Sequence, residues 1–351
     1  MFVKSINTIN LRNLKDGSYT FEKDGINLIL GNNGSGKTTI LEAVYFLNYG
    51  ESFRSFKKLN LIKLDKEYAQ INGLITINNS DICISALIKN ICQYTVNNKN
   101  VSSLTNTNTA KDELRSLIFT PENIQTITGT PSLRRELFDT YIGLTNNKYL
   151  YALSSYNKVL KQKNALLKSA NEDIDKSKYS TLEVWNLKLM EFGNSLIKYR
   201  QDYINSINPA IKKYYSEISN EEGKLKVFYN PNVSEITKKE IETNLKKELY
   251  LQTSLFGPHR DEYDIYLTSR QSRYQLSRGE QRTASFSILL SCYEQIKQLL
   301  DIKPILLLDD IASELDFKRE ERLFKVLPDG QTIITTTDGV NSENISNTLY
   351  L

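Results

Sequence analysis

Residues 31–38 read Gly-Asn-Asn-Gly-Ser-Gly-Lys-Thr, a complete G-x-x-x-x-G-K-[ST] phosphate-binding loop, or P-loop. The apolar run 26–30 precedes this loop and has the length of a strand, and residues 39–47 follow it with helical spacing. Small residues suit such a loop because they let backbone N–H groups close around a phosphate at a helix N-terminus. The stretch therefore predicts a strand–loop–helix unit that binds a nucleotide.

Individual residues of the loop have expected tasks. We expect Lys37 to reach the β- and γ-phosphates of ATP, and the Thr38 hydroxyl to bind Mg²⁺. The complete set of residues expected around the nucleotide is Gly31, Asn32, Asn33, Gly34, Ser35, Gly36, Lys37, Thr38 and Thr39.

A second motif lies near the other end of the chain. The apolar run 305–308 ends in Asp309 and Asp310, which is the Walker B pattern. We expect Asp309 to hold Mg²⁺ through water and Asp310 to act as the base that orients the attacking water. Two acids after an apolar strand are, taken alone, more often a solvated turn. The phosphate loop is what favours the catalytic interpretation.

A third motif, Leu-Ser-Arg-Gly-Glu-Gln at 276–281, resembles the L-S-G-G-Q signature of ABC-type ATPases, with Arg278 and Glu280 departing from it. A small-residue loop that opens a helix attracts anions. In ABC ATPases the signature of one subunit covers the γ-phosphate held by another. We therefore expect Ser277 (also a catalytic candidate), Gly279 and Glu280 to contact nucleotide in an ATP-dependent homodimer. An ordinary helix cap by Ser277 would explain this loop equally well on its own.

The order of the motifs narrows the class. P-loop, signature and Walker B are followed by Ser-Glu-Leu-Asp at 313–316, which matches a D-loop. From Lys37 to Ser277 is 240 residues, more than in transporters and less than in SMC proteins with their long coiled coils. Apolar side chains with helical spacing over 149–168 and 182–213, around a polar break at 171–178, predict an antiparallel helical hairpin. The hairpin either fills out the helical lobe or contacts a partner or DNA.

The expected fold is α/β, an ABC-type P-loop ATPase head. Lobe I is expected to hold a mixed sheet, built from residues 1–120 with the P-loop and 300–351 with Walker B and the D-loop. Lobe II, residues 121–299, is expected to be mostly helical and to carry the hairpin arm and the signature.

Beyond these motifs, the chain resembles the RecF family of recombination-mediator ATPases. The similar stretches are 41–55, 118–122, 131–135 with Asp139, 160–167, 256–261, 278–283 and 304–316. The resemblance implies a weak ATPase of replication and recombinational repair. It implies binding to duplex DNA or to a single/double-strand junction when ATP is bound. It also implies dimerisation through the nucleotide sites, and loading of a RecA-type recombinase at gaps with a RecR-type mediator.

Some positions depart from the ABC pattern. The switch stretch 333–338 contains no histidine, so a γ-phosphate-sensing histidine is absent there, which fits slow hydrolysis. The Q-loop position is left open between Glu122 and Gln125. The chain's one histidine, His259, lies in a Gly-Pro-His-Arg-Asp turn, where it either makes structural hydrogen bonds or lies near nucleotide or DNA.

Basic clusters supply the candidate DNA contacts. The net charge of +4 is only mildly basic, so local clusters are more informative. Such clusters are usually solvated surface, but on a DNA clamp they become phosphate contacts without base readout. The clusters are Arg54 with Lys57 and Lys58, Arg134 with Arg135, and Arg270 with Arg273 and Arg278, and the DNA candidates are Arg54, Lys57, Arg134 and Arg135.

Composition and length exclude other classes. The 351 residues, 40% hydrophobic and 25% charged, are ordinary for a globular protein. Three cysteines without metal-ligand spacing, no secretory signal and no apolar stretch of membrane length predict a cytoplasmic protein away from membranes. A transporter motor is disfavoured by the long insertion. An ATP-dependent nuclease of the overcoming-lysogenization type is disfavoured because only about 40 residues follow Walker B.

Overall fold

The computed structural model describes residues 1–104, 114–169, 176–222, 224–311, 315–337 and 344–351, with the backbone alone described for 176–178. The chain forms two compact units. The P-loop unit comprises Met1–Ile124, Lys213–Glu222 and Ser277–Leu351. The helical unit comprises Gln125–Lys212 and Gly223–Leu276.

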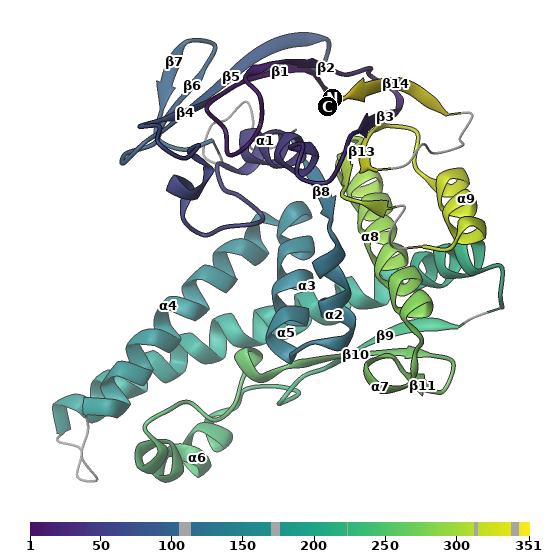
Figure 1. Cartoon of the computed structure of the whole chain (residues 1–351). Coiled ribbons are helices and arrows are strands. Elements are labelled where there is room, and N and C mark those ends of the chain that lie inside the picture. The colour runs from purple at the N-terminus through teal and green to yellow at the C-terminus, as the bar shows by residue number, and fades with distance from the viewer. Residues whose placement is uncertain (105–113, 170–175, 223, 312–314, 338–343) are drawn as a thin grey trace. The chain divides into compact units, whose positions relative to one another are not determined.

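The P-loop unit contains a six-stranded antiparallel sheet (Figure 1). Two of its hairpins turn through two-residue loops, Asn78-Asn79 and Asn97-Asn98, which all have positive φ. This is the conformation that tight hairpins require, and asparagine tolerates it well. The strand order is β2 (Gly17–Thr20), β1 (Phe2–Ile9), β4 (Ala69–Ile77), β5 (Ser80–Ile88), β6 (Gln93–Val96) and β7 (Lys99–Val101).

A second, five-stranded sheet in the same unit is parallel throughout. Its central strands β3, β12 and β13 are buried along all or nearly all of their length, as expected for strands that are covered on both faces. The strands expected in one mixed sheet are therefore divided between an antiparallel and a parallel sheet, within the α/β class that was predicted. The order is β14 (Ile345–Tyr350), β3 (Gly25–Leu30), β13 (Gln331–Thr336), β12 (Ile305–Leu308) and β8 (Ser116–Phe119).

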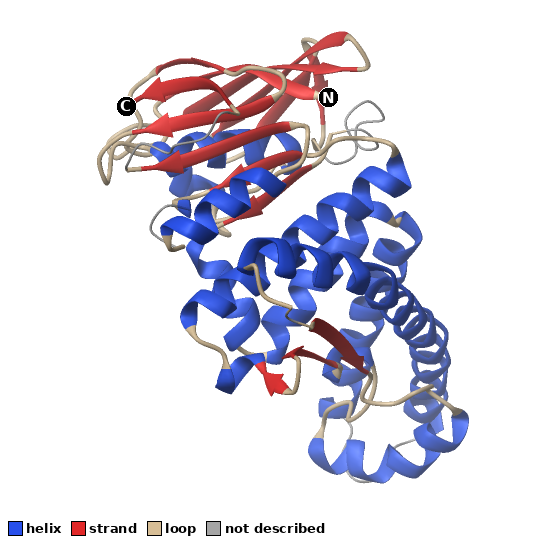
Figure 2. Ribbon diagram, turned by 90° about the vertical axis from the view of Figure 1, so that its right-hand side faces the viewer, coloured by secondary structure: helices blue, strands red, loops and turns tan. Residues whose placement is uncertain are grey.

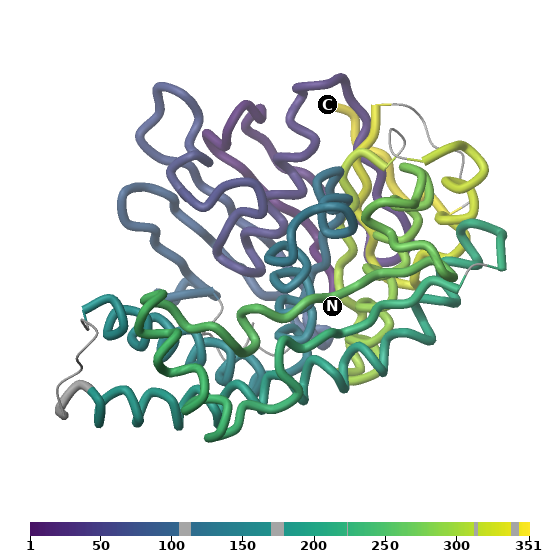
Figure 3. The backbone as a smooth tube through the Cα atoms, turned by 90° about the horizontal axis from the view of Figure 1, so that it is seen from below, coloured from purple at the N-terminus to yellow at the C-terminus, as the bar shows by residue number. Residues whose placement is uncertain are grey.

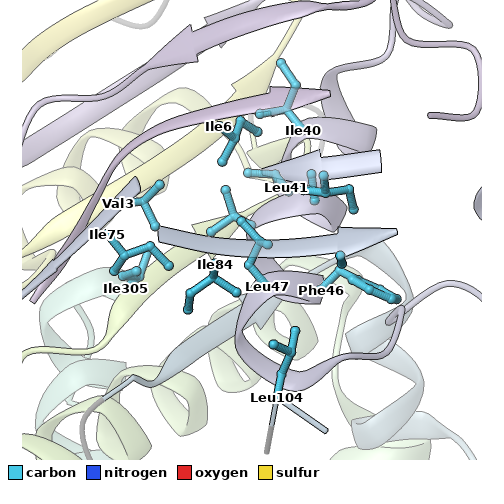
Figure 4. Packing of buried hydrophobic residues seen from close by; sticks show 14 of the residues in the cluster. Val3, Ile6, Ile40, Leu41, Phe46, Leu47, Ile75, Ile84, Leu104 and Ile305 are labelled. Atoms are coloured by element: carbon cyan, nitrogen blue, oxygen red, sulfur yellow. The ribbon is translucent and has the colours of Figure 1, made fainter. Parts of the chain in front are cut away.

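Helix α1 (Lys37–Tyr49) contacts strands of both sheets, β1 and β4 on one side and β13 and β8 on the other. Gly73 of β4 permits this packing, because a Cβ at this position would collide with Leu47 of α1. The resulting core, drawn in Figure 4, includes Val3, Ile6, Leu41, Phe46, Ile75, Ile84 and Ile305, none of them more than 1% exposed. Each such buried side chain stabilises the fold by about 1.5–3 kcal/mol.

Further helices complete the P-loop unit. Helix α8 (Arg278–Leu300) contacts β8, where the rings of Phe119 and Phe286 stack with centroids 3.8 Å apart. The unit also contains η1 (Lys58–Leu61), η2 (Pro121–Ile124) and α9 (Phe317–Val326).

The helical unit is built around two long helices, α4 (Asn147–Ser169) and α5 (Lys176–Ser219), and the last residues of α5 belong to the P-loop unit. The helices are antiparallel, since Tyr149 packs near Tyr199 and Tyr151 near Phe192, and Figure 3 shows them running alongside each other. Two helices over the predicted segments are thus present. Most of the polar break between them lies outside the described residues.

Shorter helices and a small sheet surround this pair. The helices are α2 (Gln125–Thr128), α3 (Pro131–Thr145), α6 (Lys238–Leu251), η3 (Pro258–Arg260) and α7 (Ser272–Gln275). The antiparallel sheet, drawn in red among the helices in Figure 2, has the order β11 (Arg270–Gln271), β10 (Glu262–Leu267) and β9 (Leu225–Asn230). In the described ranges, none of the helices combines the length and the apolar character needed to cross a bilayer.

The two units divide the chain at residues other than the predicted lobe boundaries. The signature and its helix, residues 277–299, were expected in lobe II but pack within the P-loop unit. The physical reason is the buried face of α8, from which Phe286 stacks on β8. Residues 121–124 and 213–222 belong to the P-loop unit as well.

Candidate nucleotide site

A pocket of about 520 Å³ lies over the P-loop. It is of the size that holds small ligands. Segments that are far apart in sequence form its walls: Asn13, then Asn33, Gly34, Gly36, Lys37, Thr38 and Thr39, then Phe53 and Arg54, then Thr120, Pro121 and Glu122, and finally Asp309 and Asp310.

The backbone conformation of the loop explains two of its glycines. Gly34 and Gly36 have φ values of 82° and 105°, which side chains rarely adopt. Gly36 also lies against Leu14, whose Cδ1 would be 2.6 Å from a Cβ at this position. The turn therefore brings the backbone into α1 without a side-chain cap at its N-terminus.

Lys37 is 8% exposed and curls back over the loop. Its Nζ donates to the carbonyl oxygens of Gly31, at 2.5 Å, and Asn32, at 3.1 Å. The Ser35 hydroxyl is buried without a hydrogen-bond partner among the described residues. An ammonium held only by carbonyls, together with an unused hydroxyl, fits a cradle for phosphate oxygens.

Asp309 joins the two ends of the sequence. The Thr38 hydroxyl, at the start of α1, donates to both its carboxylate oxygens at 2.9 and 3.0 Å. Thr335, on the neighbouring strand β13, donates to Oδ1 at 2.6 Å. Burial raises the pKa of Asp309, and nearby Asp310 adds to this, while the two hydroxyls and Arg54 act in the opposite direction. A hydroxyl and a carboxylate in contact are the oxygen ligands that Mg²⁺ prefers.

Asp310 lines the pocket beside Asp309 and has a φ of 50°. Its backbone N–H donates to the Thr335 hydroxyl at 3.0 Å, so that Thr335 contacts both acidic residues. Thr335 was missed by sequence reasoning. The available signal was a hydroxyl near the end of a buried strand that pairs in parallel with the Walker B strand.

Glu42 was also missed as part of the site's support. It is fully buried in α1 and accepts two hydrogen bonds from Arg12, at 2.5 and 2.7 Å, and one from Ser52. Arg54 Nη1 lies 3.7 Å from the same carboxylate while lining the pocket. This predicted DNA candidate is therefore placed at the nucleotide pocket.

The signature loop caps its own helix. Ser277 Oγ accepts from the backbone N–H of Glu280 at 3.3 Å, and Glu280 Oε2 accepts from the backbone N–H of Ser277 at 2.8 Å. This reciprocal arrangement is a capping box, and it gives the departure at Glu280 a physical reason. Ser277, Gly279 and Glu280 do not line the described pocket. Of the D-loop, Ser313 and Glu314 lie outside the described residues, as does Asp338 of the switch stretch.

The other predicted contacts have different outcomes. Lys57 is exposed, and Arg135 is partly buried and donates to the Asp261 carbonyl at 2.7 Å. The structure argues against Arg134 as a DNA contact. It is 4% exposed, and its guanidinium is bound bidentately by Glu262 at 2.9 and 3.0 Å and by the Gly129 carbonyl. A guanidinium that is buried and paired in this way is not available to a phosphate.

The sequence left open which residue serves as the Q-loop residue and what His259 does. The structure places the alternatives in different parts of the fold. Glu122 lines the pocket, whereas Gln125 opens α2 in the helical unit. His259 also belongs to the helical unit, where its Nδ1 lies 2.8 Å from the Tyr156 hydroxyl. Burial lowers the pKa of His259 to about 4, so a neutral ring with structural hydrogen bonds is the form that the fold favours.

A phosphate loop, a Walker B acid hydrogen-bonded to it, and a parallel sheet flanked by α1 and α8 define an ATP-binding head of the ABC/SMC class. The family model described as "RecF/RecN/SMC N terminal domain" matches residues 2–350. The chain belongs to the RecF family, as similarity over nearly its whole length shows.

Relatives and solved structures agree on this point. The "DNA replication and repair protein RecF" of Thermoanaerobacter pseudethanolicus is 36% identical over 347 residues, covering 96% of this chain and 94% of the relative. That of Bacillus cytotoxicus is 31% identical over 360 residues, covering 98% and 95%. A solved "recombination mediator protein RecF-ATPrS in RecFOR pathway" has a TM-score of 0.85 at 31% identity, covering 100% and 96%. An Smc head domain from Pyrococcus furiosus shares the fold, with a TM-score of 0.57 at 16% identity, covering 96% and 90%.

Proposed function

We propose that this chain is an ATP-dependent DNA-binding protein of replication and recombinational repair. Its ATP-bound form dimerises on DNA and, with a RecR-type mediator, helps to load a RecA-type recombinase at gaps. Membership of the RecF family supports this role, as do the names of its relatives and a RecF structure described as "RecF-ATP" in the RecFOR pathway. The DNA is bound without sequence preference, because no motif in the chain reads bases.

The observation that carries the proposal is the contact of Thr38 with Asp309 across 271 residues of sequence. Together with Lys37 it forms the constellation that P-loop ATPases use for a nucleotide and its metal. Thr38 and Asp309 would hold Mg²⁺, and Lys37 would exchange its bonds to Gly31 and Asn32 for bonds to phosphate oxygens. When bound, the metal supplies positive charge against the phosphates.

Hydrolysis is proposed to be weak. Asp310 is the residue that would orient a water and accept its proton, from a position that its bond to Thr335 fixes. The side chain at 335 is a threonine hydroxyl, and the only histidine of the chain is His259 of the helical unit. A histidine that senses the γ-phosphate is therefore not supplied by this chain's switch stretch.

The signature is proposed to act across the dimer. The capping box of Ser277 and Glu280 holds the first turn of α8 in place before a ligand arrives. Both residues stand at the start of the helix, with Ser277 exposed. The arrangement suits a preformed loop that meets a nucleotide held by a second copy.

The test is to size the purified protein, and to titrate a fluorescent duplex with it, in the presence of ATP, ADP or no nucleotide. We expect ATP alone to produce a dimer and to give the steepest dependence of log K on log salt, because a dimer neutralises more phosphates. Lys37→Ala should abolish ATP binding and both effects. Equal salt slopes in ATP and ADP would contradict an ATP-gated clamp.

A further inference from the structure

One arginine from a separate helix lies against the signature loop, although it is not part of the signature motif. Arg319, near the start of α9, extends its guanidinium over Gly279. A Cβ at position 279 would collide with Arg319 Nη1 and would lie 3.5 Å from its Cζ. A side chain at position 279 would therefore have to displace the guanidinium from the place that it occupies.

The guanidinium lies close to the loop but makes no hydrogen bond within the described residues. Its side chain is 20% exposed, and its one ion pair in the described ranges, with Asp316 at 3.6 Å, is longer than a hydrogen bond. Its backbone N–H donates to the Asp316 side chain and so fixes the start of α9. No guanidinium hydrogen of Arg319 bonds to another residue in the part of the chain that the structure describes. Up to five donors remain for an acceptor from outside.

We propose that Arg319 is the phosphate-binding cation of the signature loop, and that Gly279 serves to seat it there. This inference rests on the proposed ATP-gated dimer and names a residue for it. In that dimer the guanidinium of one copy receives the terminal phosphate oxygens of the nucleotide in the other copy. Planar guanidinium groups suit this task because they bind phosphate with paired hydrogen bonds.

The local charges agree with an anionic ligand. Arg278, one of the two residues that depart from the signature consensus, is exposed in the same loop. The one carboxylate in the loop, Glu280, is bonded to the backbone N–H and hydroxyl of Ser277 and is thereby held in the capping box. Asp316 is mostly exposed, at 59% of its side chain, so its pairing with Arg319 is weak and readily exchanged for phosphate.

A different task for Gly279 is distinguishable by experiment. If the glycine only allows the backbone to approach a phosphate, Gly279→Ala should weaken dimerisation whether or not Arg319 is present. If it seats Arg319, the effect of the alanine should vanish once the arginine has been removed. The displaced group is the end of a flexible side chain, and alanine favours helix more than glycine does. Gly279→Ala should therefore fold with an unchanged or higher Tm.

The experiment is a double-mutant cycle read by ATP-dependent dimerisation in analytical ultracentrifugation. We expect Arg319→Ala and Gly279→Ala each to weaken the ATP-bound dimer by roughly ten- to a hundredfold, in line with the loss of hydrogen bonds to a charged group. The double variant should be no weaker than Arg319→Ala, which is the signature of coupling. Arg319→Lys should recover part of the loss. ATP affinity of the monomer, measured by titration, should be unchanged in all of them.

The outcomes separate the inference from the proposed function. If the native protein forms no dimer with ATP, the proposed function fails first. If the native protein dimerises and Arg319→Ala dimerises equally well, Arg319 is not the cation. If the two single effects add, Gly279 acts independently of Arg319 and the seating role is overturned. If Arg319→Ala lowers the Tm, Arg319→Lys is measured as well. If Arg319 were purely structural, its variants would lose dimerisation only together with Tm. A loss of dimerisation at an unchanged Tm therefore supports phosphate binding by Arg319.

Discussion

At the scale of single residues, the site depends on hydroxyl groups as much as on acids. Asp309 accepts from Thr38 and Thr335, and Thr335 also accepts from the backbone of Asp310. Thr335 thereby links the two Walker B residues, and its hydroxyl lowers the pKa of Asp309 against the burial that raises it. Asp310 carries a left-handed φ of 50° in the same place, a conformation that costs about 1 kcal/mol or more for residues other than glycine.

We predict that Asp310→Asn separates nucleotide binding from hydrolysis. The amide keeps the size of the side chain and tolerates a positive φ, but it cannot accept a proton from water. Hydrolysis should fall by about a hundredfold or more, while ATP affinity stays within a few-fold of the native value. Phosphate release and nucleotide titration measure the two quantities. The matched control is Asp329→Asn, at a side chain that is 83% exposed. Hydrolysis at the native rate by Asp310→Asn would show that Asp310 has only a structural role.

At the scale of elements, local capping and buried ion pairs explain positions that pattern alone left ambiguous. The Ser277–Glu280 capping box accounts for the start of α8, and Thr237 and Glu240 form the same box at the start of α6. In the helical unit, Arg200 of α5 is 2% exposed and binds Asp139 of α3 and Asp261 after η3. Removing one partner of such a pair leaves a buried charge, so these bonds hold the elements in register.

The turn η3 gives an element-scale prediction about pH. Burial lowers the pKa of His259 to about 4; Arg260 acts in the same direction, and the Ser254 carbonyl and Asp261 oppose it. A folded pKa below the ordinary value near 6.5 means that the unfolded chain binds more protons between these values. The helical unit should therefore lose stability as pH falls from about 6.5 towards 4, by up to roughly 3 kcal/mol.

The measurement is urea unfolding between about pH 4 and 7.5, followed by the fluorescence of Trp185, the only tryptophan and a residue of α5 in the helical unit. His259→Gln keeps polar atoms near Tyr156 but has no proton to bind in this range. Its stability should fall less steeply with acid than that of the native protein. Parallel curves for the two proteins would show that the titration of His259 does not contribute.

At the scale of the whole molecule, DNA binding depends on how many phosphates an assembly neutralises. The structure revises the candidates for this task, since Arg134 is consumed by Glu262 and Arg54 faces the nucleotide pocket. Of the other two candidates, Arg135 is partly buried and donates to the Asp261 carbonyl. Lys57 is exposed on the segment between α1 and η1, beside a fully exposed Phe56. The proposed dimer would present two such lysines to the same duplex.

We predict that Lys57→Gln reduces the salt dependence of DNA binding in the ATP state. Each phosphate that is no longer neutralised lowers the slope of log K against log salt by about 0.9, so the slope for the dimer should fall by up to about 1.8. Fluorescence titrations over a series of salt concentrations measure the slope. Lys325→Gln is the control, because Lys325 is 69% exposed and paired with Glu321. An unchanged slope for Lys57→Gln, together with unchanged affinity, would remove Lys57 from the interface.

What the sequence by itself determined is the set of features that neighbouring residues decide. The P-loop, the Walker B strand, the signature turn and the two helices of the hairpin were predictable because each depends on residues within one turn, strand or helix. The family resemblance was carried by stretches of the same kind. The cap by Ser277, named as an alternative for the signature loop, is equally local, as are the tight Asn-Asn hairpins and the capping box at Thr237, which were not singled out.

Only the tertiary structure decided which distant side chains meet. Thr335 contacts Asp309 because β13 lies next to β12 in the parallel sheet, and Glu42 is paired because Arg12 and Arg54 converge on α1. Burial of Arg134 and the seat of Arg319 over Gly279 likewise depend on packing between separate elements. A single sequence carries no local signal for such contacts. Charge and spacing are the same for an exposed arginine as for a buried one, and burial decides whether it binds a phosphate or a carboxylate.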